Sequence, residues 1–434
     1  MMEHEEAKAF LDKTNFRLSD RTQKLLYAFV AIGIIGFAIG LLSRSSYLAW
    51  QALLVNTLFF GGIALGGLAF TAILTITNAK WGRPLKRLAE GFAVFIPFAA
   101  LLFVILFFGA PRLFEWANPG KVIAAKDGWL NMPFFVIRNI SALALIIALS
   151  IFYLKFSARP DLGLASPWDR PLNKLCQWVS KNYTQHDQEM VLAQERTKTL
   201  APILAVVFFL VSTLIAFDWI MSLDQEWYST MFGAQYAVSN LIGAGAALLI
   251  IAGFVREKFG LKDYITINRY HDLARLTFAL CALWAYLVFA QVLVIWYGNL
   301  PHEAAFLVLR MESLEWGWVS WLLFILMAII PFFGLLSRRA CRSIWFSRLI
   351  AVDMLFGGWL EKYFLVVPSI QENNARAGII EATKGLPGFS LNLYDVSIAL
   401  GVGAIFLLTY VWFFRWVPVL PLADPLLVKE QDEP

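Results

Sequence analysis

The chain has 434 residues, of which 59% are hydrophobic and only 15% are charged. A soluble domain carries about 25% charged residues, so the composition excludes a soluble protein. It predicts an all-α, polytopic membrane protein that forms one transmembrane domain over residues 1–434. The formal net charge of +5 does not imply a nucleic-acid partner, because the basic residues gather in loops on one side of the predicted helices.

Histidine and cysteine positions limit the cofactors that this chain could hold. The four histidines are predicted to lie in loops or at membrane edges: His4, His186, His271 and His302. Haem ligation by paired intramembrane histidines is therefore excluded. The three cysteines are widely spaced and form no CxxC pair: Cys176, Cys281 and Cys341. This spacing argues against an iron–sulfur cluster or structural zinc bound by this chain alone.

Ten apolar stretches are long enough to cross a bilayer, since a spanning helix needs about 20 residues. We predict spans at residues 25–42, 48–77, 88–108, 132–155, 200–222, 230–256, 275–297, 315–336, 345–367 and 393–416. The N-terminal segment MMEHEEAKAFLDKTNF lacks the charged-then-apolar layout of a signal peptide, so we expect the first span to remain as a membrane helix. Glycine pairs in the first two spans are typical of close helix packing: Gly36 and Gly40, Gly62 and Gly66.

Lys and Arg concentrate at the termini and in alternate loops, which places both termini in the cytoplasm by the positive-inside rule. The spans divide into a first group over residues 25–155 and a second over 200–416. Between them, residues 156–199 form a cytoplasmic connection in which LNKLCQWVSKNY is predicted to be an interfacial amphipathic helix. Its apolar side would carry Leu172, Leu175, Trp178 and Val179.

Two long, partly apolar loops are predicted on the opposite side. They are GNLPHEAAFLVLRMES, before the eighth span, and PSIQENNARAGIIEATKGLPGFSLN, before the tenth. Such loops could dock a partner outside the membrane, or they could fold back as lids over a cavity of this protein. The sequence leaves both alternatives open.

Charged side chains at membrane depth are functional candidates, because each costs roughly 2.5–3.5 kcal/mol at a helix centre by insertion scales. Six of them are predicted to share the outer half: Arg138, Asp218, Glu315, Glu361, Lys362 and Asp395. They could form a neutralised salt-bridge cluster that holds helices together. They could also form a proton exit or a polar pocket for a quinol head group. In either case unpaired ions would be costly, so pairing is expected.

Asp353 is predicted near the midplane, with no basic neighbour in sequence. Apolar surroundings disfavour the charged form of a lone carboxyl, which suits a proton carrier. Neutral polar residues could extend a path from it: Tyr236, Ser239, Asn240 and Tyr286, with Gln235 and Gln291. They could equally make ordinary hydrogen bonds between packed helices. At the inner edge, Glu90, His271 and Asp272 could admit protons, or could simply be solvated helix ends.

Three stretches carry a family resemblance: FDWIMSLDQEWYSTMFGAQY at 217–236, the stretch from YHDLARL to YGNLPHE at 270–303, and WLEKYFLVVPS at 359–369. Together they resemble the smaller NrfD-like (polysulfide reductase membrane subunit-like) proteins of bacterial alternative complex III. The resemblance covers essentially the whole chain. One departure lies in Pro301, His302 and Glu303, where the family often has two acids after the proline.

The resemblance implies two four-helix bundles, spans two to five and six to nine, flanked by spans one and ten. It implies a bacterial cytoplasmic membrane location and a complex with multihaem and monohaem cytochromes, an iron–sulfur subunit, a larger NrfD-like paralogue, small membrane subunits and, in some assemblies, a terminal oxidase. Haems and iron–sulfur clusters would then belong to the partners. Quinol oxidation in this family is thought to centre on the larger paralogue, so a quinone or menaquinone contact by this chain is a secondary expectation.

The sequence supports two functional hypotheses. The first is a membrane subunit of a quinol:acceptor oxidoreductase that supports assembly and moves protons along its intramembrane ionisable residues. The second is a secondary transporter, since such folds use broken spans and Gly243–Gly245 and Gly401–Gly403 could mark breaks.

Overall fold

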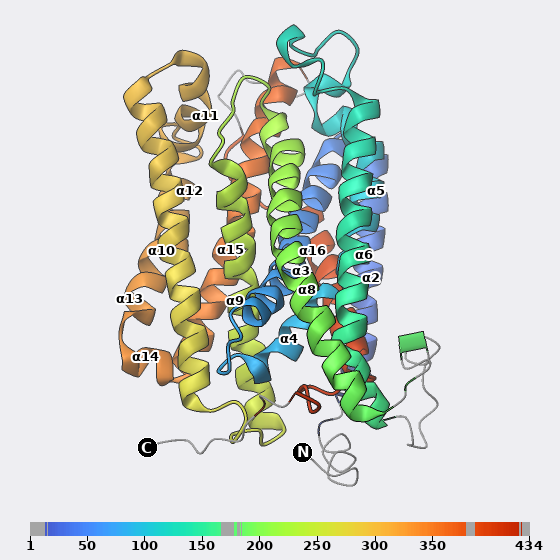
Figure 1. The fold of residues 1–434 in the computed structure, drawn as a ribbon. Helices are drawn as coiled ribbons and strands as arrows, with labels where there is room; N and C mark the ends of the chain where they lie inside the picture. The colour runs from blue at the N-terminus through green and yellow to red at the C-terminus, as the bar shows by residue number, and fades with distance from the viewer. Residues whose placement is uncertain are drawn as a thin grey trace.

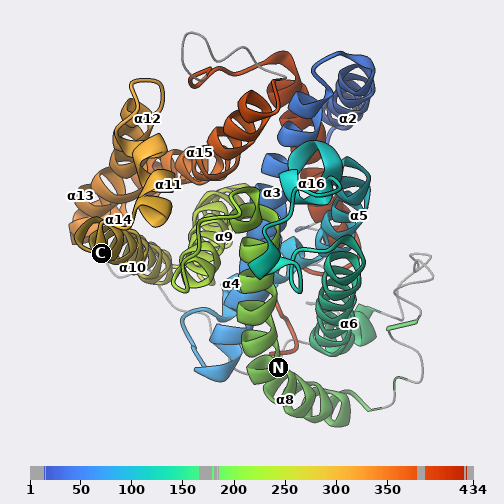
Figure 2. The same cartoon turned by 90° about the horizontal axis from the view of Figure 1, so that it is seen from above.

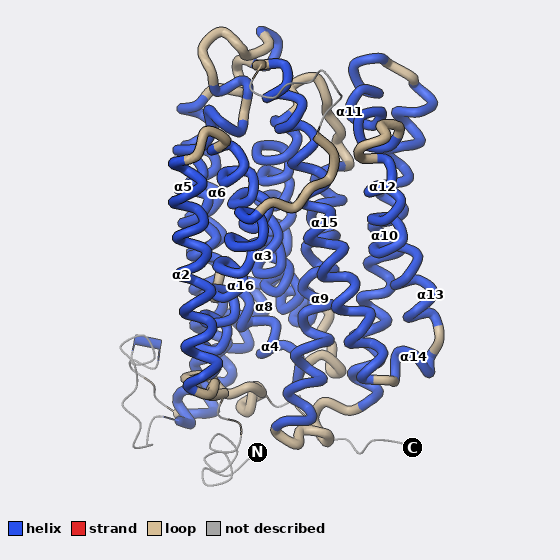
Figure 3. Tube along the Cα trace, turned by 180° about the vertical axis from the view of Figure 1, so that it is seen from behind, coloured by secondary structure: helices blue, strands red, loops and turns tan. Residues whose placement is uncertain are grey.

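The computed structural model describes residues 14, 16–165, 178–179, 183, 185–378, 387–424 and 427. Over this part of the chain the backbone forms helices and connecting loops, without a strand (Figure 3). The predicted all-helical class is therefore confirmed. Leu172 and Leu175 of the predicted amphipathic helix lie outside the described residues, whereas Trp178 is exposed and Val179 is buried.

Nine helices of the described chain are long and apolar enough to cross a membrane, which supports the predicted multi-pass membrane protein. They run at Asp20–Leu42 (α2), Ser46–Ile76 (α3), Arg83–Leu113 (α4 and α5), Met132–Gly163 (in α6), His186–Leu223 (α8 and its extension), Phe232–Lys258 (α9), Ile267–Gly298 (α10), Gly317–Leu336 (α12 and α13) and Leu393–Phe414 (α16). Their axes run in roughly the same direction (Figure 1). We call the end where α2 begins and α16 ends the inner end.

The predicted ninth span corresponds to α15, a continuous helix over Ile344–Arg376. It is not among the nine apolar helices, because Asp353, Glu361 and Lys362 interrupt its apolar run. This helix nevertheless packs against α9, α3 and α13. Shorter helices connect the long ones at Pro301–Met311 (α11) and Arg338–Arg342 (α14).

Helix α3 occupies the middle of the molecule, where it contacts α4, α5, α8, α9 and α16 (Figure 2). Glycines permit its closest approach. A Cβ atom at Gly66 would lie 2.1 Å from the backbone oxygen of Asn240 in α9, and one at Gly62 would lie 2.3 Å from that residue's Oδ1. Only a residue without a side chain fits at such a distance. These glycines therefore serve helix packing.

The glycines that could have broken two spans do not do so. Helices α9 and α16 run without interruption through Gly243–Gly245 and Gly401–Gly403. A Cβ at Gly401 would lie 2.8 Å from Gly33 Cα, so Gly401 lets α16 pack tightly against α2. The breaks expected for a transporter are absent from both helices.

Irregular turns occur at other places. A π-helical turn at Ala216–Ile220 ends α8, and a second at Ile325–Ile329 separates α12 from Ile330–Leu336 (α13). A non-helical step at Val94 and Phe95 divides α4 (Arg83–Ala93) from α5 (Ile96–Leu113). π-Helical turns are frequent at functional sites, and the first of these two carries Asp218.

Candidate functional site

The centre of the candidate site is the adjacent pair Glu361 and Lys362 on α15, both almost fully buried. Lys362 Nζ lies 2.7 Å from Glu361 Oε2 and 2.7 Å from Ser239 Oγ of α9. The Ser239 hydroxyl also donates to Glu361, and Lys362 Nζ sits 4.6 Å from the centre of the Tyr236 ring. The structure therefore brings together four residues that the sequence had placed on one path.

A chain of neutral polar groups extends from Glu361 toward the outer end. Trp284 Nε1 and Gln235 Nε2 donate to Glu361 Oε1 at 2.6 and 3.2 Å. Gln291 Nε2 donates to Gln235 Oε1 at 2.7 Å, and Ser229 Oγ donates to Gln291 Oε1 at 2.8 Å. These contacts link α9, α10 and α15 through one hydrogen-bonded network.

This network forms one wall of a cavity of about 380 Å³ between α9, α10, α11, α12 and α15. Glu361, Gln235, Gln291 and Trp284 reach its surface. The rest of the lining is largely aromatic and aliphatic, and includes Trp227, Phe232, Phe289, Phe306, Trp321 and Phe364. An apolar chamber with a few convergent polar groups is typical of small-molecule sites.

Helix α11, in the loop before the eighth span, forms part of this cavity through Phe306, Leu307, Arg310 and Met311. Of the two predicted alternatives for this loop, the structure favours the lid over the protein's own cavity. The ring of Phe306 stacks on that of Trp227, with centroids 3.8 Å apart. That contact fastens the lid to the loop before α9.

Arg310 is the residue of this site that sequence reasoning missed. It is 1% exposed, and its guanidinium donates to the Leu365 carbonyl and to Ser369 Oγ, both at 2.9 Å. No ion pair is formed by Arg310 in the described structure, and its charge lies 3.5 Å from the Phe306 ring centre. Burial lowers the pKa of Arg310 to about 9, yet guanidinium groups remain protonated near neutral pH. The sequence did contain a signal for Arg310, because an arginine within the apolar run AAFLVLRM is a candidate for a buried, functional charge.

Arg138 and Asp218 form a separate cluster at the outer ends of α6 and α8. Arg138 Nε and Nη2 donate to the two oxygens of Asp218 at 2.7 and 2.9 Å. Asn139 and Trp129 donate to the same carboxylate at 2.6 and 3.2 Å. The guanidinium also stacks over the Trp129 ring at 4.2 Å. A carboxylate offers about four acceptor positions, so Asp218 is saturated by fixed donors.

The remaining outer residues do not join either cluster. Asp395 is buried at the start of α16, where it accepts from the Asn392 backbone in a reciprocal cap. Glu315 lies in the turn before α12, with its Cβ 3.2 Å from the position that a Cβ of Gly388 would take. Arg138, Glu315 and Asp395 were expected to form one outer cluster. Over the described residues no ion pair connects them, because they lie on elements that meet different neighbours.

The three residues predicted to admit protons at the inner edge lie on two different helices, with Glu90 on α4 and His271 and Asp272 on α10. Glu90 of α4 is fully buried and accepts from Arg87 and, at 2.6 Å, from Ser157 Oγ. His271 and Asp272 lie at the start of α10, where His271 Nδ1 is 3.2 Å from Asp272 Oδ1. The Nε2 atom of His271 is buried and has no hydrogen-bond partner among the residues that the structure describes.

Asp353 lies about 12 Å along α15 from Glu361, at 1.5 Å rise per residue. Its Oδ2 atom is buried and has no hydrogen-bond partner in the described structure. Asn240 of α9 is buried beside the glycines of α3. Tyr286 is 61% exposed on α10, and no hydrogen bond joins it to the Glu361 network in the part of the chain that the structure describes. Glu361 and Asp353 therefore lie at different depths on one helix, and no chain of hydrogen bonds joins them over the described residues.

No group of three or more His, Cys, Asp or Glu side chains in the described chain is placed to hold a metal ion. The chain matches no protein-family model and no curated protein. The site's geometry is therefore the main support for any functional conclusion.

Proposed function

We propose that this chain is a membrane subunit of a quinol:acceptor oxidoreductase, and that the cavity beside Glu361 receives the quinol head group. The observation that carries this proposal is the combination of an apolar chamber of about 380 Å³ with a buried, hydrogen-bonded carboxylate in its wall. A quinol has the same character, because it joins a polar, proton-releasing ring to an apolar tail.

The residues fit the two needs of such a ligand. The aromatic lining gives the ring flat surfaces for offset or edge contacts. Glu361 has four donors in this structure, so a quinol hydroxyl would replace one of its rotatable donors, Ser239 or Gln235, on the carboxylate. Arg310 supplies a fixed positive charge on the same cavity. Oxidation of a quinol releases protons and electrons together. Glu361 would take a proton, and Lys362 and Ser239 would stabilise the carboxylate between transfers.

The electrons must leave through other polypeptides. We propose that haems and iron–sulfur clusters are held by partner subunits: multihaem and monohaem cytochromes, an iron–sulfur protein, a larger NrfD-like paralogue, small membrane subunits and, in some assemblies, a terminal oxidase. The proposed setting is a bacterial cytoplasmic membrane, with ten spans, two four-helix bundles and both termini in the cytoplasm. Support comes from the NrfD-like motifs at 217–236, 270–303 and 359–369.

Purification of the tagged, full-length chain from its native membranes in mild detergent tests the proposal. A quinol oxidoreductase subunit is expected to come out with haem-bearing partners and with quinol oxidation activity. A chain that purified alone, colourless and stable would contradict the proposal and favour the transporter. A photoreactive quinone analogue is expected to label the lining of the Glu361 cavity, and labelling elsewhere only would contradict the assigned site.

A further inference from the structure

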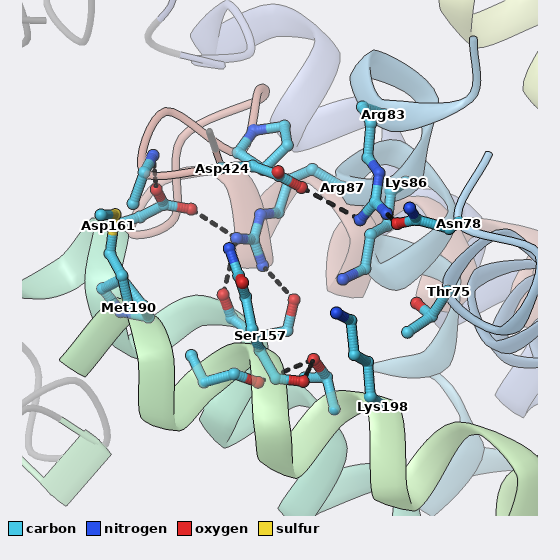
Figure 4. Close-up of a pocket in the computed structure, with 16 residues that line it drawn as sticks. Thr75, Asn78, Arg83, Lys86, Arg87, Ser157, Asp161, Met190, Lys198 and Asp424 are labelled. Atoms are coloured by element: carbon cyan, nitrogen blue, oxygen red, sulfur yellow. Dashed lines mark hydrogen bonds and ion pairs between the residues drawn. The ribbon is translucent and has the colours of Figure 1, made fainter. Parts of the chain in front are cut away.

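A second cavity, of about 270 Å³, lies at the inner end between α4, α6, α8 and the segment that follows α16 (Figure 4). Four cations reach its surface: Arg83, Lys86, Arg87 and Lys198. It is distinct from the Glu361 cavity, with which it shares no lining residue. Any role of this second cavity is therefore independent of the proposed quinol function.

Two of the four cations are already neutralised. Arg87 is held between Glu90 and Asp161, and it donates to the Ser157 carbonyl at 2.9 Å. Arg83 pairs with Asp424 at 3.2 Å. These acids anchor the walls of the cavity, since Asp161 also accepts from the backbone of the segment after α16 at 2.8 Å. The two arginines therefore stabilise the walls of the cavity, and their charges are already paired with carboxylates.

The two lysines are different. Lys86 is 7% exposed, and its nearest carboxylate oxygen, on Glu90, is 3.9 Å away, beyond hydrogen-bonding distance. Its ammonium group makes no hydrogen bond in the described structure and lies 5.6 Å from the Tyr153 ring centre. Lys198 approaches from α8, and Figure 4 shows both ammonium groups pointing into the same space. No hydrogen bond or ion pair is formed by Lys198 in the described structure.

Two convergent ammonium groups repel each other, and Glu90, which forms a long ion pair with Lys86 at 3.9 Å, is shared with Arg87. An anion between the two lysines would relieve their repulsion and give each ammonium group a direct hydrogen-bond acceptor. Lysine is a point-charge ligand for phosphate groups, and basic pockets between transmembrane helices on the cytoplasmic side receive anionic head groups. We propose that this cavity binds a phosphate-class anion between Lys86 and Lys198, supplied either by a phospholipid head group or by soluble phosphate.

Bound phosphorus can be measured on the full-length chain together with whatever subunits purify with it. Organic extraction separates phospholipid phosphorus from soluble phosphate, so this measurement identifies the source. After delipidation, inorganic phosphate and phosphatidylglycerol nanodiscs are tested as separate probes by thermal shift, because a ligand that binds the folded state raises its melting temperature. Phosphatidylcholine nanodiscs provide the neutral-lipid comparison.

The deciding variant is Lys198→Glu, because Lys198 is exposed and its replacement is expected to leave the fold intact. It is expected to weaken binding of the effective probe at least tenfold. Lys86→Gln is expected to do the same, and Lys86→Arg to restore binding in part. Lys262→Glu is the matched control, since Lys262 is an exposed lysine in the inner loop after α9 and lies outside the cavity.

Stabilisation of the wild-type protein by inorganic phosphate would support the site and identify soluble phosphate as the source of the anion. Stabilisation by phosphatidylglycerol but not by phosphatidylcholine would support the site and identify a phospholipid head group as the source. The proposal is overturned if neither probe stabilises the wild-type protein, or if Lys198→Glu binds the effective probe as well as Lys262→Glu does.

Discussion

The Arg138–Asp218 cluster and the Glu361–Lys362 cluster are both buried ion pairs in an apolar helical protein, yet their surroundings differ. Asp218 is held by a bidentate guanidinium, an amide and an indole, and none of these groups reaches the Glu361 cavity. Glu361 also has several donors, but two of them come from short or rotatable side chains, Ser239 and Gln235. The carboxylate itself lies on the cavity wall.

The comparison teaches that a buried ion pair indicates function only when a ligand in a neighbouring cavity can reach one of its two charged groups. A bidentate arginine fixes geometry, whereas the lysine ammonium is a compact charge on a flexible stem that can change partners. We therefore propose a structural role for the outer pair and a proton-handling role for the cavity pair. Substitutions in the two regions should separate these roles, with the largest loss expected at the outer pair.

Replacement of Arg138 by Met should destabilise the protein most. Loss of one partner leaves the Asp218 charge buried and uncompensated, which costs about 3–5 kcal/mol in folding free energy. Thermal unfolding and assembly yield in mild detergent measure this loss. The control is Arg376→Gln, which breaks a pair whose arginine side chain is 55% exposed and which should cost about 1 kcal/mol or less. Equal losses of stability in the two variants would contradict a structural role for the outer pair.

Replacement of Glu361 by Gln should slow quinol oxidation by the assembled complex roughly 100-fold, since proton transfer by a positioned group contributes about 10²–10⁴-fold. The variant also leaves the Lys362 ammonium buried without its carboxylate, which lowers stability and yield. The double variant Glu361→Gln with Lys362→Met separates chemistry from folding, because it leaves no buried unpaired charge. It should assemble like the wild type and remain slow. Full activity in the double variant would contradict the proton-handling role.

Replacement of Gly66 by Ala should separate α3 from α9, because the new Cβ would lie 2.1 Å from a backbone oxygen of Asn240. Overpacking of this kind costs about 1–3 kcal/mol, and it would also move Ser239, the neighbour of Asn240 in the chain, relative to Glu361. The matched control is Gly358→Ala, where the nearest atom is 3.6 Å from the added Cβ. A similar melting temperature for both variants would refute the packing argument.

Replacement of Asp353 by Asn should change stability by less than about 1 kcal/mol, because its Oδ2 atom has no hydrogen-bond partner to lose. Its effect should appear instead in proton release per quinol, measured in vesicles with the intact complex. Unchanged stoichiometry would exclude Asp353 from the proton path and would leave the Glu361 cavity and the assembly role untouched.

The sequence alone determined the helical membrane class and the approximate positions of the helices, because a bilayer demands long apolar runs and admits few other signals. It also pointed to Glu361, Lys362, Ser239 and Tyr236, since charged and polar side chains are conspicuous in such runs. Even the α15 helix was predicted, although its charges keep it out of the nine apolar helices found in the described chain.

Only the tertiary structure decided which polar groups meet. Residues of one helix face can be recognised from spacing, but a partner on another helix depends on helix rotation and axial offset, which apolar sequence scarcely constrains. For that reason the structure paired Asp218 with Arg138 and not with Glu361, assigned Asp395 to a helix cap, and placed Arg310 in the cavity. The inner cavity was equally hidden, because Lys86 and Lys198 are far apart in sequence and meet only across the space that α4 and α8 both line.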